Sequence, residues 1–248
     1  MSAYTSLAAA YDGLTTDVDY AAILDFLEAI LHHAGKQPET VLDLACGTGS
    51  MSLLLAERGC RVLGADISEE MLTEAAAKAA KLTENPPYFI CQPMQRLRLP
   101  APVDAVFCLL DSLNYLTNPE DCRQTFSRVF RALKDDGVFL FDINTPRKLR
   151  ALDGQVFLDE NEDSYCVWRA EFDERENCCY YGIDLFRKHG ALWERSFEQH
   201  CEYAYDPLVL RQWLLETGFA RVECYADRRM EAPSDAEQRI YFVAWKEK

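Results

Sequence analysis

Two glycines and two aspartates have the types and spacing of a nucleoside-binding site. Asp43, Gly47 and Gly49 lie in the segment DLACGTG, which ends a short apolar run. Glycines there let a ligand approach the backbone closely, and a helix starting near Ser50 would point free N–H groups at it. Asp66 lies 17 residues after Gly49, and its carboxylate can accept hydrogen bonds from both hydroxyl groups of a ribose.

The choice of nucleoside depends on one missing glycine and one additional acid. A dinucleotide site favours G-x-G-x-x-G, but Ser52 takes the third position here. Asp43, four residues before Gly47, would repel a pyrophosphate and attract an α-ammonium group. The segment therefore favours S-adenosylmethionine over NAD. An NAD-dependent oxidoreductase and a catalytically silent S-adenosylmethionine-binding regulatory or scaffold protein remain alternatives.

Alternating apolar and helical segments predict an α/β fold that can position these residues. After a helical stretch over 4–34, the expected strands are 41–45, 61–66, 86–91, 103–110 and 137–143. The expected intervening helices are 50–59, 69–82 and 119–134. Strands that alternate with such helices imply right-handed crossovers and a parallel sheet. We expect a doubly wound, mostly parallel, Rossmann-like sheet of seven strands, with the ligand at the carboxyl ends of the strands.

The pattern changes after about residue 148. Aromatic-rich runs at 165–172, 178–188 and 191–205 predict an antiparallel meander. A helix at 207–217 and strands at 220–226 and 239–246 are expected to follow. The prediction is a cofactor-binding domain with an N-terminal helical cap (1–148 and 206–248), and an antiparallel β insert (149–205) that acts as a lid and specificity element.

The composition of the chain disfavours nucleic acid, membrane and metal as binding partners. The 41 acidic side chains exceed the 26 basic ones, and the net charge of −15 disfavours a nucleic-acid substrate. The longest apolar run, Ala105–Leu110, is too short to span a membrane, and the first residues lack the pattern of a signal peptide. None of the ten cysteines forms a C-x-x-C pair, so we expect reduced cysteines, no metal site and a cytoplasmic location.

Taken together, these segments resemble the class I S-adenosylmethionine-dependent methyltransferases. The sequence is similar to a bacterial small-molecule-type group whose members begin with a Y-D-x-L helix, here at residues 11–14 and followed by Asp17, Asp19 and Tyr20. The segments VLDLACGTG, GADISEEML, CLLDSLNYL and GVFLFDINTP match the blocks of that group in order.

The resemblance implies a set of cofactor contacts. Asp43, Ala45 and Gly47 would line the methionine end of the cofactor, and Gly49 would shape the loop. Asp66 would hold the ribose, and Ile67 and Met94 would lie beside the adenine. Leu110 and Asp111 would lie beside the sulfonium, and Tyr11 would close over it. Pro93 stands where similar sequences have an acid that meets the adenine amino group, so the carbonyl of Gln92 is the candidate replacement.

The acceptor side is predicted less directly. Asn114 and Tyr115 follow a buried strand and are candidates for cofactor or substrate contact, whereas Trp168 either packs under the insert or lines an acceptor pocket. A general base near neutral pH is most readily a histidine, so His200 is one candidate and Asp111 another, with solvent as an alternative. The expected reaction is in-line methyl transfer to a nitrogen or oxygen atom of a small molecule, by a monomer or homodimer.

Overall fold

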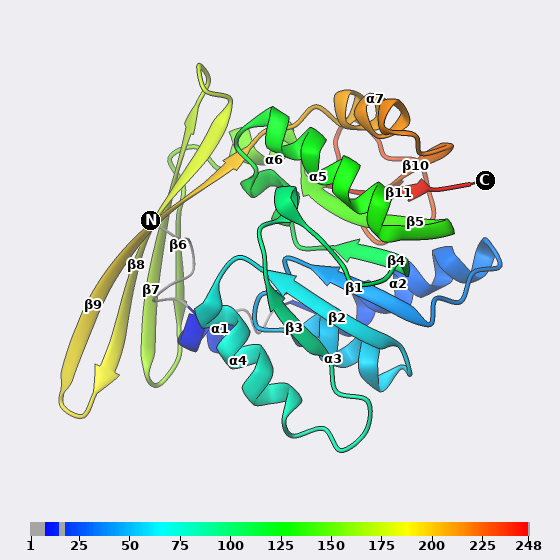
Figure 1. Cartoon of the computed structure of the whole chain (residues 1–248). Helices are drawn as coiled ribbons and strands as arrows, with labels where there is room; N and C mark the ends of the chain where they lie inside the picture. Colours follow the sequence, from blue (N-terminus) through cyan, green and yellow to red (C-terminus); the bar gives the residue numbers. More distant parts are fainter. Residues whose placement is uncertain (1–7, 15–17, 248) are drawn as a thin grey trace.

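The central element of the protein is a mostly parallel β-sheet. Within residues 8–14 and 18–247, which the computed structural model describes, seven strands follow the order β10-β11-β5-β4-β1-β2-β3 (Figure 1). Neighbours among β1 to β5 are parallel, whereas β11 is antiparallel to β5 and β10. The strands are β1 (Thr40–Leu44), β2 (Arg61–Asp66), β3 (Tyr88–Cys91), β4 (Val103–Cys108), β5 (Leu133–Asn144), β10 (Arg221–Ala226) and β11 (Arg239–Trp245). This arrangement confirms the predicted fold class.

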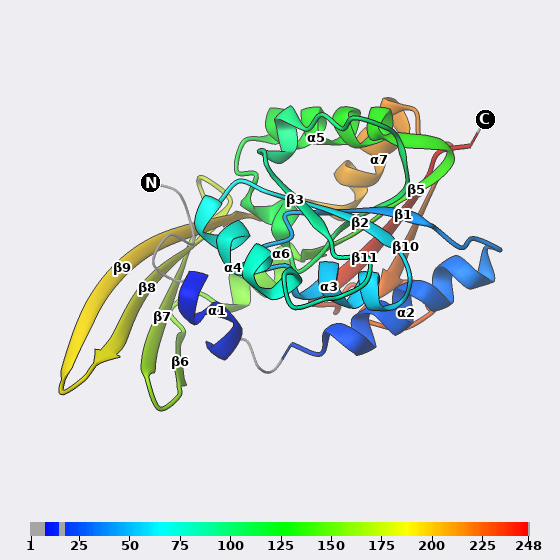
Figure 2. The same cartoon turned by 60° about the horizontal axis from the view of Figure 1, so that its bottom comes forward.

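Helices cover both faces of the sheet because each has one apolar side. The helices of the main body are α2 (Tyr20–His33), α3 (Ser50–Glu57), α4 (Glu69–Ala79), α5 (Pro119–Ala132) and α7 (Pro207–Thr217). Figure 2 shows α5 and α7 on one face, and α2 and α3 on the other. Phe126 and Leu214 belong to the core of the first face, and Leu27 and Leu55 to the core of the second. Both layers hold the same central strands in place, as expected when parallel strands are buried on two faces.

The N-terminal segment forms two helices instead of one. α1 (Ala8–Leu14) is separate from α2, and Val18 and Asp19 are not helical. Asp19 caps α2, because its carboxylate accepts a hydrogen bond from the Ala22 N–H at 2.9 Å. The prediction of one helical stretch was therefore wrong at this boundary. The parts of it at residues 4–7 and 15–17, including Asp17, lie outside the described residues.

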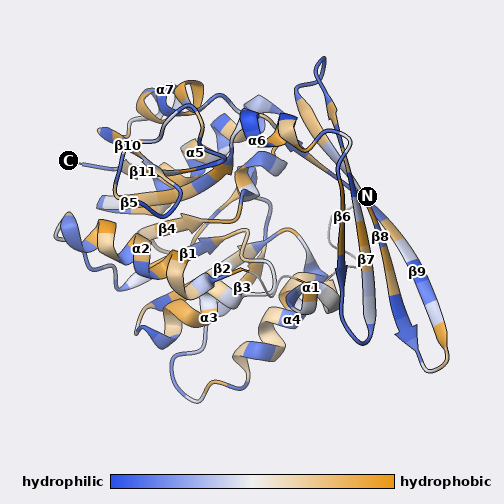
Figure 3. Cartoon of the chain, turned by 180° about the vertical axis from the view of Figure 1, so that it is seen from behind, coloured by the Kyte–Doolittle hydropathy of each residue, from blue (hydrophilic) through white to orange (hydrophobic). Residues whose placement is uncertain are grey.

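An antiparallel sheet stands beside the main body. In the described part of the chain its four strands are β6 (Val156–Glu160), β7 (Ser164–Asp173), β8 (Cys178–His189) and β9 (Leu192–Tyr203). α6 (Pro146–Ala151) leads into it. The sequence did not predict β6, whose residues are mostly exposed and show no alternation. Figure 3 shows the contrast between the hydrophobic strands β4 and β5 and the more mixed insert.

One face of the insert packs against the rest of the protein. Cys166 and Ile183 of the insert form a buried cluster with Leu14 of α1 and Leu149 of α6. The insert is therefore attached through the N-terminal helix as well as through its own chain connections.

Candidate functional site

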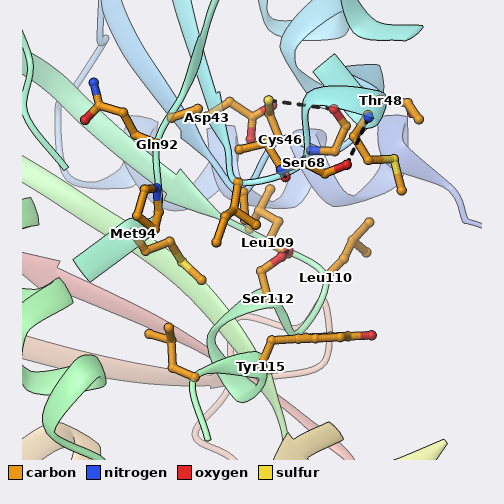
Figure 4. Close-up of a pocket in the computed structure, with 18 of the residues that line it drawn as sticks. Asp43, Cys46, Thr48, Ser68, Gln92, Met94, Leu109, Leu110, Ser112 and Tyr115 are labelled. Atoms are coloured by element: carbon orange, nitrogen blue, oxygen red, sulfur yellow. Dashed lines mark hydrogen bonds between the residues drawn. The ribbon is translucent and has the colours of Figure 1, made fainter. Parts of the chain in front are cut away.

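A cavity of about 380 Å³ opens at the carboxyl ends of the central strands. It lies where the strand order reverses, because β1 is flanked by β2 on one side and β4 on the other. Open α/β sheets bind ligands at such a switch point, and a cavity of this size suits a nucleoside cofactor. Figure 4 shows Asp43, Cys46 and Thr48 at one end of the cavity and Tyr115 at the opposite end.

The loop after β1 has an unusual backbone. Ala45, Gly47 and Gly49 have φ angles of 59°, 53° and 78°. The Cys46 N–H donates to the carbonyl of Ala65 at 3.1 Å, which ties the loop to β2. Ala45 and Gly47 line the cavity, whereas Gly49 does not. A Cβ at Gly49 would lie 2.9 Å from the Cβ of Ala75, so this glycine permits close packing on α4.

Asp43 is almost completely buried and lines the cavity from β1. The Ser52 hydroxyl donates a hydrogen bond of 2.5 Å to its carboxylate, so the residue in place of the third glycine supports Asp43. Burial raises the pKa of Asp43 to about 6, and the charge of Asp66 acts in the same direction. A cation in the cavity would favour the ionised form of Asp43.

Asp66 lies at the end of β2 and faces the same cavity. Its carboxylate accepts hydrogen bonds from the Gly47 N–H at 2.8 Å and from the Ser68 N–H at 2.9 Å. These two bonds fix the carboxylate against the glycine loop, and each oxygen keeps a further lone pair for a ligand hydroxyl. Burial raises the pKa of Asp66.

Apolar side chains line the cavity beyond Asp66. Ile67 is 61% exposed, and both Ile67 and Met94 border the same space. The Gln92 side chain is held elsewhere: its Oε1 accepts from the Arg98 N–H at 2.9 Å, and its Nε2 donates to the Arg98 carbonyl at 3.3 Å. In Figure 4 this amide points away from the other labelled side chains. Gln92 lines the cavity, but the geometry does not favour its carbonyl as the replacement for the missing acid.

The turn after β4 is strained and tightly held. Leu110 and Asp111 both have left-handed backbone, with φ angles of 57° and 53°. The carboxylate of Asp142 on β5 accepts from both of their N–H groups, at 2.7 and 3.0 Å. Arg239 of β11 donates to Asp142 and, at 2.6 Å, to Asp111. Leu110 lines the cavity, whereas Asp111 is directed to Arg239 and is not among the lining residues.

The predicted acceptor residues occupy different environments. Tyr115, in the 3₁₀ turn Ser112–Tyr115, lines the cavity. Asn114 is buried, and its amide donates to the carbonyls of Asn144 and Tyr203, each at 3.0 Å. It therefore joins the main sheet to the insert.

His200 and Trp168 lie behind the cavity wall. The His200 side chain has no exposed surface, and its Nε2 lies 3.0 Å from the Glu198 carboxylate. Its ring makes edge contacts with the rings of Tyr115 and Trp168, at centroid distances of 5.9 and 6.4 Å. Neither His200 nor Trp168 is among the residues that line the cavity.

Sequence reasoning missed much of the lining. The additional lining residues are Tyr20, Cys46, Thr48, Met51, Ala65, Ser68, Met71, Pro93, Gln95, Leu109, Ser112, Leu116, Thr117 and Asp121. Tyr20 had a signal in the N-terminal motif, Ala65 and Leu109 lie near the ends of predicted strands, and the others follow predicted strands or belong to or flank the glycine loop. Among the described residues, the lining includes three aspartates and no lysine or arginine.

Two features are absent from the described residues. No group of three or more His, Cys, Asp or Glu side chains there could hold a metal ion. In the same part of the chain, no helix is both long and apolar enough to cross a membrane.

Comparisons with known proteins agree with this geometry. Residues 41–137 match the family described as methyltransferase domain. A protein of Geobacillus sp. strain WCH70 that is named as a methyltransferase is 35% identical over 246 residues, which cover 98% of this chain and 99% of the relative. A glycine/sarcosine N-methyltransferase of Aphanothece halophytica is 34% identical over 203 residues, or 82% of this chain and 73% of that enzyme. The structure of an S-adenosylmethionine-dependent methyltransferase from Clostridium acetobutylicum superposes with a TM-score of 0.85, 27% identity and full coverage of both chains.

Proposed function

Since the chain belongs to the class I S-adenosylmethionine-dependent methyltransferases, we propose that it methylates a nitrogen or oxygen atom of a small molecule. The cofactor supplies a methyl group that is activated by a sulfonium. The observation that carries the proposal is the cavity itself, which brings Asp43 and Asp66 together at the switch point of the sheet.

The charge of the cavity fits this cofactor. Its lining has three carboxylates and, within the described residues, no lysine or arginine. Such a site favours a ligand with an ammonium and a sulfonium and disfavours a pyrophosphate. We assign Asp66 to the ribose hydroxyls and Asp43 to the amino acid end. Ile67 and Met94 would enclose the adenine, and Tyr11 would cover the cofactor from α1.

The negative charge of the lining also favours a nitrogen acceptor, an amine, over an oxygen acceptor. Asp121 belongs to the lining and follows Tyr115 by six residues, and Figure 4 shows Tyr115 at the end of the cavity opposite Thr48 of the glycine loop. A protonated amine would be attracted there, and its neutral form presents the lone pair that attacks the methyl group. The glycine/sarcosine N-methyltransferase of Aphanothece halophytica supports a nitrogen acceptor by similarity.

We propose that the protein contributes to catalysis mainly by aligning the acceptor atom with the methyl group of the cofactor. In-line displacement requires nucleophile and methyl carbon at roughly 3–3.5 Å, with water excluded. Asp111 and His200 are our predicted proton acceptors, but the first is directed to Arg239 and the second lies behind Tyr115. We therefore propose that the acceptor loses its proton to solvent before water is excluded from the site, and that His200 supports the Tyr115 ring.

Calorimetry and a product assay test this function. S-adenosylmethionine and S-adenosylhomocysteine should both bind, whereas NAD should not. Asp66→Ala should weaken both affinities by about 1.5–3 kcal/mol, or about 10- to 150-fold, because the ribose donors lose a charged acceptor. Asp25→Ala removes an exposed ion pair with Arg58 that does not line the cavity, and it should leave both affinities unchanged.

Incubation with methyl-labelled cofactor and a panel of small amines and phenols should yield a labelled product. Binding of NAD without S-adenosylmethionine would overturn the cofactor assignment. Cofactor binding without label transfer to any amine or phenol would instead support the silent binding protein.

A further inference from the structure

Helix α1 lies between the cofactor cavity and the β insert. Figures 1 and 2 both show it beside α4 and close to the strands of the insert. The helix has seven residues, and isolated helices of that length are not stable in water. Its position therefore depends on the contacts of its own side chains and backbone.

Asp12 of α1 is held from two directions. The Thr48 hydroxyl donates to its Oδ1 at 2.6 Å, and the Lys78 ammonium donates to its Oδ2 at 2.6 Å. Lys78 also donates to the hydroxyls of Thr48 at 3.2 Å and Ser50 at 3.0 Å. One carboxylate thus connects α1 to the glycine loop and to α4.

The residues next to Asp12 have different partners. Tyr11 lines the cavity, and burial raises the pKa of its hydroxyl, which stays protonated. The carbonyl of Gly13 accepts from the amide of Asn161 in the β6–β7 turn at 3.3 Å. Leu14 is buried with the inner face of the insert. Four consecutive residues therefore contact the cavity, the glycine loop, the insert turn and the insert core in sequence order.

From these contacts we propose that Asp12 is a positioning residue that fastens Tyr11 over the bound cofactor and so limits the rate of cofactor release. The inference rests on the cofactor site proposed above. Loss of the Asp12 carboxylate frees α1 from the glycine loop, and Tyr11 then withdraws from the cavity more often. The same movement loosens the β6–β7 turn, because Gly13 and Leu14 belong to the same short helix.

An ordinary surface ion pair would behave differently. Exposed pairs contribute little to stability or affinity, and Asp12 and Lys78 are 47% and 24% exposed. Thr48, however, is 2% exposed and lies in the loop that lines the cavity. The proposal therefore concerns the release rate of a ligand that lies under Tyr11 and not the stability of the fold.

Stopped-flow displacement of S-adenosylhomocysteine tests the proposal. Asp12→Ala should raise the dissociation rate about 3- to 10-fold, consistent with the loss of an ordinary hydrogen bond at a partly exposed carboxylate, and should leave the association rate nearly unchanged. Alanine also has the higher helix propensity, so a faster release does not follow from a weaker helix. Lys78→Met should also raise the dissociation rate, and the double variant should release the ligand no faster than Asp12→Ala. Lys78→Arg keeps the positive charge and should therefore have nearly the wild-type dissociation rate.

A matched control and a second readout complete the test. Asp25→Ala removes a comparable ion pair between α2 and Arg58 and should leave the dissociation rate unchanged. Amide exchange of residues 160–164 should slow when S-adenosylhomocysteine binds the wild-type protein, and much less in Asp12→Ala. An unchanged dissociation rate in Asp12→Ala, or an equal rise in Asp25→Ala, would overturn the proposal. Failure of the wild-type protein to bind S-adenosylhomocysteine would contradict the proposed function instead.

Discussion

Replacement of Asp43 by asparagine should stabilise the cofactor-free protein at neutral pH. Burial raises the pKa of Asp43 from 3.8 to about 6, and the neighbouring Asp66 contributes to this shift. At about 1.4 kcal/mol per pKa unit, ionised Asp43 lowers the free energy of unfolding by about 3 kcal/mol. The folded pKa is the higher one, so this loss is absent below pH 3.8, grows as the pH rises, and is complete above about pH 6. Ser52 can still donate to the asparagine carbonyl, so its hydrogen bond is kept.

The assay is denaturant unfolding of the wild-type and Asp43→Asn proteins at pH 7.5 and pH 4.5 without cofactor. The stability gained by the variant should be larger at pH 7.5, and the difference between the two gains should be about 2 kcal/mol. The cost of burying the asparagine amide is the same at both pH values, so it drops out when one gain is subtracted from the other. Asp25→Asn, at an exposed position, should show no such difference. A gain independent of pH, or larger at pH 4.5, would refute the reasoning.

Three further substitutions test the packing around the site, each by denaturant unfolding. Asp142→Asn should lower the free energy of unfolding by about 1–3 kcal/mol, because Arg239 loses one of its two carboxylate partners and keeps only Asp111, and an unchanged stability would contradict this account. Gly64→Ala places a Cβ 2.5 Å from the Phe89 ring and should cost about 1–3 kcal/mol, part of which Phe89→Leu should recover. Asn114→Ala should cost about 2–4 kcal/mol, since it leaves buried backbone groups without partners; a neutral effect would contradict its linking role.

The sheet and the glycine loop were predictable because their signals are local. Short apolar runs alternate with amphipathic helices, and the rules of parallel connections then leave few topologies. Asp43 and Asp66 could be placed in one cavity because each ends a strand, and β1 and β2 are neighbours. Tyr115 and Leu110 follow from the same logic, since the end of β4 lies beside the end of β1.

Side-chain partners far apart in sequence were not predictable. Asp111 has the position of a general base, but Arg239, which directs it away from the cavity, lies 128 residues later. His200 lies on the expected strand, yet the pairing of β9 with β8 and the edge contact with Tyr115 bury its ring behind the cavity wall. Gln92 turns towards the backbone of Arg98 because the chain folds back on itself after β3. In each case the type of residue suggested a role, and tertiary packing decided its orientation.

The two aspartates of the cavity differ in how their charges are compensated, and this difference predicts separate roles. Asp66 accepts two backbone N–H groups, whereas Asp43 accepts the Ser52 hydroxyl and faces a lining without lysine or arginine in the described residues. A carboxylate with so little compensation gains most from a ligand cation. Asp43→Asn should therefore weaken S-adenosylhomocysteine, which has an ammonium, and leave 5′-methylthioadenosine, which lacks the amino acid end, nearly unaffected. Asp66→Ala should weaken both ligands alike, because both present the ribose hydroxyls. Equal weakening of the two ligands by Asp43→Asn in calorimetry would place the ammonium elsewhere in the cavity.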